Sequence, residues 1–227
     1  MADSGLDPEL IDLLTRDEPL HPDLEAHLVT TDFGRMVHHP LVIEHAPRPA
    51  MVNYRYEAKR KALHEAMSDS NWHQAVWLHE RPYRLDAFMQ IEDDLDDDEY
   101  WSILADIWLD SENIWQNLDQ WRELFESTRP GSPMSPEERE LLSWLPDPIP
   151  VYRGGVEDAN EYGLSWTTDR ERAQWFAVRM ASDEDVAVVL EGWVAHKDVA
   201  AYFTGRGEDE IVVFDADLVD VVARATL

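Results

Sequence analysis

The chain has 227 residues, of which 44% are hydrophobic and 10% aromatic, enough apolar side chain for a packed core, so global disorder is excluded. It carries 48 acidic and 19 basic residues, a formal charge of −29, and this charge repels nucleic-acid backbones and anionic membranes and favours a basic protein as partner. Cysteine is absent, which excludes disulfides, thiolate catalysis, Cys-type zinc sites and iron–sulfur clusters.

Residues 1–50 are predicted to be an irregular N-terminal segment with a helical stretch at Pro8–Leu14 and a short strand at Leu41–Ile43. The reason is the pair of steps His39-Pro40 and Ala46-Pro47, since proline lacks an amide donor and disfavours helix in the residue before it.

Residues 51–130 are predicted to form a helical domain, because apolar residues recur there at spacings of three and four. Arg81-Pro82 begins one helix, and Asp110-Ser111 marks a restart in the next. An aromatic and apolar stripe with helical spacing is interpreted as core: Trp101, Leu104, Trp108, Trp115, Leu118, Trp121 and Phe125.

Residues 131–150 are predicted to be a linker and a short helix that ends near Leu145. Ser135, Pro136 and Glu138 form a capping-box pattern at its start.

Residues 151–227 are predicted to be rich in strands, which are expected at Val151-Tyr152, Val186–Val194, Ile211–Phe214 and Leu218–Val222. One helix is expected over Asp169–Met180. This part has net charge −9 and the rest −20, so the two parts are expected to do different work.

Metal sites are not expected. The acidic run Glu92–Glu99 fits the first ligand positions of a calcium-binding EF-hand loop, but Glu99 stands where the loop needs glycine and Ala105 where it needs glutamate. Nine histidines are scattered along the chain, and neither His38-His39 nor His64-Glu65 continues to a second metal-ligand histidine at helical spacing.

Three short segments of the C-terminal part carry the candidate chemistry: Tyr152–Gly155, Gly163–Thr168 and Tyr202–Glu210. In order and spacing they resemble the arginine–serine–glutamate class of ADP-ribosyltransferases, over about residues 140–227. The resemblance implies an α+β fold, in which a mostly helical N-terminal part precedes a two-sheet β core with few helices. It also implies transfer of ADP-ribose from nicotinamide adenine dinucleotide (NAD) to a protein, with arginine as acceptor.

The resemblance assigns roles to residues. Glu210 is the carboxylate that stabilises an oxocarbenium-like ribose, and Glu208, expected on the same side of an extended strand, holds and deprotonates the acceptor. Arg153 binds phosphate and ribose, Gly154 allows close approach to nicotinamide, and Ser165 orients Arg153, Glu210 or the ribose.

Further residues complete the predicted site. Thr167 is placed with the cofactor, and Tyr202 and Phe203 with the acceptor. Trp166 stands where the family commonly has Thr, and strand alternation points it away from the site. Tyr162 and Trp175 are open to either of two roles, stacking on nicotinamide or packing in the core.

Alternative functions remain open on the sequence. The same fold with another acceptor is an NAD glycohydrolase, if the acceptor is water, or a transferase to a nucleic-acid base, a drug or a side chain other than arginine. A non-catalytic acidic protein that mimics nucleic acid and blocks a basic protein is a third reading. We expect a cytoplasmic protein, in the host cytoplasm if phage-encoded, since its first residues lack a basic, apolar leader and no apolar run approaches eighteen residues.

Overall fold

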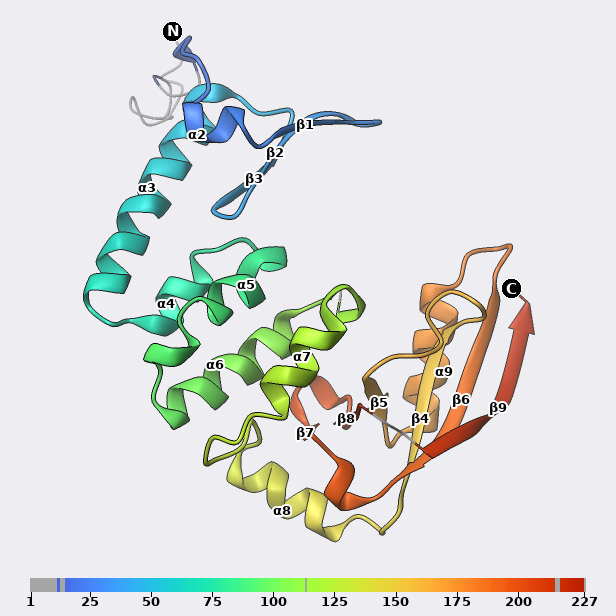
Figure 1. Cartoon of the computed structure of the whole chain (residues 1–227). Coiled ribbons are helices and arrows are strands. Elements are labelled where there is room, and N and C mark those ends of the chain that lie inside the picture. Colours follow the sequence, from blue (N-terminus) through green and yellow to red (C-terminus); the bar gives the residue numbers. More distant parts are fainter. Residues whose placement is uncertain (1–11, 13–14, 113, 215–216, 227) are drawn as a thin grey trace, which may run out of the picture. The chain divides into compact units, whose positions relative to one another are not determined.

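A computed structural model of the chain describes residue 12 and residues 15–112, 114–214 and 217–226. The helix expected at Pro8–Leu14 lies almost entirely outside these residues. The chain is mixed α+β and forms two compact units, Met1–Ile103 and Leu104–Leu227 (Figure 1).

The first unit combines a small sheet with helices. Its elements are α2 (Pro22–Glu25), β1 (Leu28–Thr31), β2 (Gly34–His39), β3 (Val42–His45), α3 (Pro49–Ser68), α4 (Trp72–Trp77), α5 (Arg84–Met89) and the first part of α6 (Asp97–Asp110), with short 3₁₀ turns at Arg81–Tyr83 and Glu92–Asp94.

The prediction of an irregular segment over residues 1–50 is wrong for residues 28–39, whereas the short strand expected at Leu41–Ile43 overlaps β3. Residues 28–45 form a three-stranded antiparallel sheet in the order β1-β2-β3. His39 pairs with Val42, so Pro40 occupies a tight turn, where a missing amide donor costs no ladder hydrogen bond. Pro40, which indicated irregular structure in the sequence, therefore lies in the turn that connects two strands.

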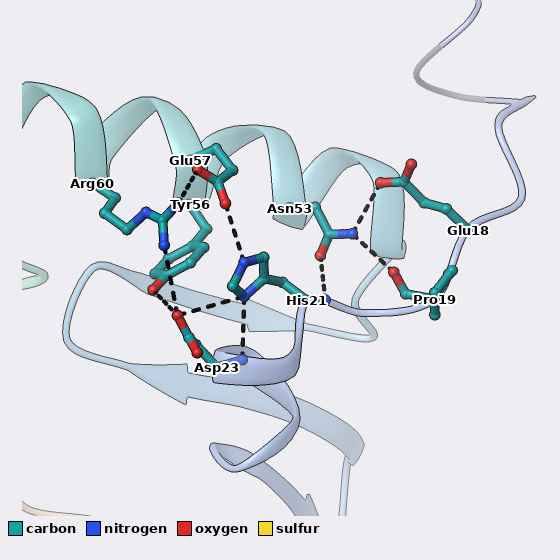
Figure 2. A network of polar contacts seen from close by, with 8 residues as sticks. All are labelled: Glu18, Pro19, His21, Asp23, Asn53, Tyr56, Glu57 and Arg60. Atoms are coloured by element: carbon teal, nitrogen blue, oxygen red, sulfur yellow. Dashed lines mark hydrogen bonds and ion pairs between the residues drawn. The ribbon is translucent and has the colours of Figure 1, made fainter.

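Polar contacts tie the residues before the sheet to α3 (Figure 2). Asn53 accepts a hydrogen bond from the amide of His21 at 2.8 Å and donates to Glu18 at 2.9 Å. The Tyr56 hydroxyl donates to Asp23 at 2.7 Å, and this hydrogen bond lowers the pKa of the Asp23 carboxyl. Beside these contacts lies an apolar cluster made of Leu24, Val37, Leu41, Val42, Val52 and Tyr56.

The acidic run Glu92–Glu99 includes a 3₁₀ turn and the first residues of α6. Leu95 in its middle is buried, and α6 begins at Asp97. The Asp96 carboxylate accepts from the amide of Glu99 at 2.8 Å. Acidic side chains at a helix N-terminus are stabilised by the exposed amides and the helix dipole, which explains part of this charge density.

The described part of the second unit contains the rest of α6, three further α-helices, three 3₁₀ turns and a sheet. Its elements are a 3₁₀ turn at Ile114–Asn117, α7 (Leu118–Phe125), α8 (Pro136–Trp144), β4 (Ile149–Val156), β5 (Ser165–Thr167), α9 (Arg170–Met180), β6 (Val186–Val194), a 3₁₀ turn at His196–Asp198, β7 (Ala201–Phe203), a 3₁₀ turn at Gly205–Gly207, β8 (Glu210–Val212) and β9 (Asp217–Thr226).

One six-stranded antiparallel sheet organises this unit, in the order β7-β8-β5-β4-β6-β9. Within the described residues it replaces the two packed sheets expected for this part. Successive residues of β4 face opposite sides of the sheet. Val151 packs with Ile149, Trp166 and Leu190 on one side. Tyr152 packs on the other side against the cluster of Ala173, Ala177, Ala187 and Val189, which includes residues of α9. Helix α9 contacts β4 and β6, and Figure 1 shows it running alongside these strands.

Several local predictions for the second unit are confirmed. Ser135 and Glu138 form both hydrogen bonds of a capping box at the start of α8. The helix expected over Asp169–Met180 is α9, which Asp169 caps by accepting from the amides of Glu171 and Arg172. The strand expected at Val186–Val194 is β6, and the strand expected at Ile211–Phe214 overlaps β8, which ends at Val212.

The domain boundary predicted between residues 130 and 131 differs from the boundary between the two compact units, which falls inside α6. In the second unit the Trp108 ring meets the rings of Trp121 and Phe125 edge to face. The ring centroid of Phe125 lies 6.0 Å from that of Phe214, in the sheet region. These aromatic contacts draw α7 and the end of α6 into the C-terminal unit.

The predicted aromatic stripe holds only in part. Trp101, Leu104, Trp108, Trp121 and Phe125 are buried, but Trp115 is 67% exposed and Leu118 40% exposed. Helix α6 ends at Asp110 and a 3₁₀ turn follows at Ile114–Asn117. This turn breaks the helical period and moves Trp115 off the buried face.

Candidate functional site

Three adjacent strands carry the predicted site residues. Arg153 lies on β4, Ser165 and Thr167 on β5, and Glu210 begins β8. Thr167 pairs with Glu210, so Ser165, Thr167 and Glu210 share one face of the sheet. Chain segments about 45 residues apart in sequence therefore meet at one place.

Glu210 is the best defined member of this group. It is only 8% exposed, and its Oε1 accepts a hydrogen bond of 2.5 Å from the Ser165 hydroxyl. The indole Nε1–H of Trp108 donates to the same oxygen at 3.1 Å. Hydrogen bonds to a carboxylate favour its ionised form and fix its orientation.

Arg153 ties neighbouring segments together. β4 and β5 pair at Tyr152 and Thr167, and next to this pair the guanidinium donates to the carbonyl of Ser165 at 2.6 Å. It also donates to the carbonyls of Glu161 at 3.0 Å and Asn160 at 3.1 Å. Arg153 thus holds the 157–163 loop against the sheet, a role beyond the cofactor contact predicted from sequence.

Burial lowers the pKa of Arg153 to about 10, whereas the charges of Glu210 and Glu161 act in the opposite direction. At neutral pH the guanidinium is protonated. A fixed positive charge therefore accompanies Glu210 within this acidic chain.

Gly154 has a packing role that the sequence did not indicate. A Cβ at this position would lie 1.8 Å from the carbonyl oxygen of Ala173 and 2.6 Å from the amide nitrogen of Ala177. The missing side chain lets α9 pack on β4, so the close approach is made by a helix backbone.

Thr167 positions the loop that carries Glu208. Its hydroxyl donates to the Glu208 carbonyl at 2.7 Å and accepts from the amide of Asp169 at 3.0 Å. Arg172 holds the same loop through the carbonyl of Gly207 at 3.0 Å. The cofactor contact predicted for Thr167 is thus accompanied by a structural role that the sequence did not indicate.

The strand alternation used to place Glu208 beside Glu210 does not apply. Glu208 ends a 3₁₀ turn, Asp209 has a left-handed φ of 44°, and β8 begins only at Glu210. The two glutamates remain close in the chain, but a tight turn separates them instead of an extended strand.

Tyr202 and Phe203 are core residues, which corrects their predicted role in acceptor binding. They are 5% and 2% exposed on β7. The Tyr202 hydroxyl donates to Asp209 at 3.3 Å, and burial raises the pKa of Tyr202 to about 12. Their apolar rings fix the edge of the sheet under the Glu208 loop.

Trp166 points away from the site as predicted, since it is buried in the core and its indole donates to the carbonyl of Gly163 at 2.9 Å. Tyr162 and Trp175 are 65% and 46% exposed, so the core alternative for these two residues is wrong. The guanidiniums of Arg172 and Arg179 lie 5.4 and 4.9 Å from the Trp175 ring.

Trp108 is the site residue that sequence reasoning missed. Its helical spacing indicated a core position, which is correct for the ring, but 102 residues separate it from Glu210 and no local pattern predicts their hydrogen bond.

In the described part of the chain no three His, Asp or Glu side chains are placed to hold a metal ion. No helix among the same residues is long and apolar enough to cross a membrane. Comparison with protein-family models, with curated proteins and with solved structures found no match to this chain.

Proposed function

We propose that the C-terminal unit transfers ADP-ribose from NAD to a protein side chain, with arginine as the acceptor. The observation that carries the proposal is the 2.5 Å hydrogen bond from Ser165 to the nearly buried carboxylate of Glu210, beside the strand that bears Arg153. A fixed and nearly buried carboxylate is suited to stabilise positive charge on a ribose.

The donor set fits NAD in part. Among the described contacts three carbonyls take donors from Arg153, and a guanidinium has about five N–H groups, so two remain for a ribose or phosphate oxygen. NAD would supply a nicotinamide leaving group, whose departure takes the electron pair of the glycosidic bond. Arg153 would then bind and orient the substrate, and Glu210 would stabilise the ribose.

Glu208 is proposed to act on the acceptor. A carboxylate matches a guanidinium through paired hydrogen bonds and can take the proton that the guanidinium loses when its nitrogen bonds to the ribose carbon. The contacts of Thr167 and Arg172 with the carbonyls at 207–208 hold the backbone that carries Glu208 beside β5.

Replacing Glu208 with alanine should separate two reactions. Transfer to a small arginine analogue is expected to fall about 10²-fold or more, while hydrolysis of NAD to free ADP-ribose stays within about threefold, because water needs no guanidinium clamp. Chromatography of both products in one reaction measures the ratio. Glu171→Ala, an exposed change on α9, is the control. Equal loss of the two products would place Glu208 in ribose stabilisation or in folding.

A second candidate is an acidic protein that blocks a basic target without catalysis. It is favoured by the net charge of −29 and by the three Arg153 donors already engaged by carbonyls.

Incubating the full chain with biotinylated NAD, a lysate and a basic arginine-rich protein distinguishes the two functions. Label on arginine, located by mass spectrometry, supports the transferase. Stoichiometric binding without label, weakened by salt, supports the acidic blocker and contradicts the transferase.

A further inference from the structure

The carboxylate of Glu210 is held from two sides. Ser165 donates from the neighbouring strand at 2.5 Å, and Trp108 donates from α6 at 3.1 Å. Both reach the same oxygen, Oε1. The charge that the proposed transfer requires is therefore fixed partly by a residue outside the segments that carry the resemblance.

A buried aromatic cluster fixes the position of Trp108. The ring is 2% exposed and meets Trp121 edge to face at 5.1 Å and Phe125 at 5.2 Å. Such packing restricts the indole to one orientation, with its N–H directed at Glu210.

The same cluster is anchored to the chain that follows β8. Phe125 lies 6.0 Å from Phe214, and Arg122 donates to the carbonyl of Phe214 at 3.2 Å with its guanidinium 5.1 Å from that ring. Helix α7 is thus tied to a point four residues beyond Glu210, so the donor and the carboxylate belong to one packed assembly.

We propose that Trp108 is a positioning residue, whose indole N–H keeps the Glu210 carboxylate ionised and aimed at the substrate ribose. The inference rests on the proposed function. Removing a donor from a nearly buried carboxylate costs more than removing one from an exposed group, because water does not replace the lost bond.

Trp108→Phe removes the N–H and keeps an aromatic ring. We expect kcat to fall roughly 10-fold or more, the size of a hydrogen bond to a charged group, while KM for NAD changes less than about threefold. The acidic limb of the pH–rate profile is expected to move to higher pH, since the ionised form has lost a donor.

Trp121→Phe is the matched control, because Trp121 lies in the same cluster and its ring contacts are with Trp108 and Phe125. It makes the same indole-to-phenyl change and is expected to leave the pH–rate profile in place. Equal effects of the two variants on kcat and on the profile would overturn the inference, because they would indicate loss of packing alone. A Trp108→Phe enzyme faster than the wild type would also overturn it, because the indole would then obstruct the site.

A second measurement needs neither activity nor a Trp108 variant that folds. Each of the 10 tryptophans gives one indole N–H signal in a ¹⁵N NMR spectrum of the full chain. One signal should shift with acid titration in the wild type and stay constant in Glu210→Gln. If no indole signal depends on Glu210, the contact and the inference are both wrong.

Failure of the proposed function and failure of the positioning role alone give different results. A wild-type chain without transferase or glycohydrolase activity, but with an indole signal that follows Glu210, would refute the proposed function and end the positioning role with it. An active wild type in which Trp108→Phe behaves like Trp121→Phe would refute only the positioning role.

Discussion

Glu210→Gln is expected to lower the rate of ADP-ribose transfer by about 10²–10³-fold, with little change in NAD binding. Glutamine keeps an oxygen that can accept from Ser165 and Trp108, so the local structure should persist. What is lost is the negative charge beside the developing positive ribose. Single-turnover transfer, with NAD affinity measured by calorimetry, tests the separation of rate from binding.

Asp209→Asn is the matched control for this variant. It removes one carboxylate charge from the adjacent position, and asparagine tolerates the left-handed φ of 44° found there. Transfer by Asp209→Asn should stay within a few-fold of the wild type. Glu210→Gln with wild-type turnover would remove Glu210 from the chemistry, and equal losses in both variants would indicate a general charge effect.

Gly154→Ala is expected to lower the free energy of unfolding by about 3 kcal/mol, the upper part of the usual range for overpacking. The added Cβ would lie 1.8 Å from the Ala173 carbonyl oxygen, and backbone cannot move aside as a flexible side chain can. Helix α9 must therefore shift from β4. Urea unfolding followed by circular dichroism measures the change.

Gly205→Ala provides the comparison for the glycine prediction. A Cβ there meets nothing within 4 Å, so its expected effect on stability is within about 0.5 kcal/mol. Similar unfolding curves for Gly154→Ala and Gly205→Ala would show that α9 does not pack on β4 as closely as the distances state.

Local patterns predicted the elements whose stability is local. The capping box at Ser135 and Glu138 needs only residues within a few positions, and it forms. The β1–β3 sheet was missed because Pro40 indicated a break, whereas its effect depends on whether the turn needs its amide. Glu208 was misplaced because the alternation argument requires extended backbone, which the turn at Asp209 interrupts.

The sequence by itself determined the elements of the C-terminal part and the order of Arg153, Ser165 and Glu210, because strand and helix patterns and residue types are written in the chain. The tertiary structure alone decided the contacts among them: the Trp108 donor on Glu210, the three carbonyls on Arg153 and the helix against Gly154. The hydrogen bonds among these contacts span from 7 residues, between Arg153 and Asn160, to 102 residues, between Trp108 and Glu210. Their formation depends on how strands register and helices pack, and no local periodicity encodes that.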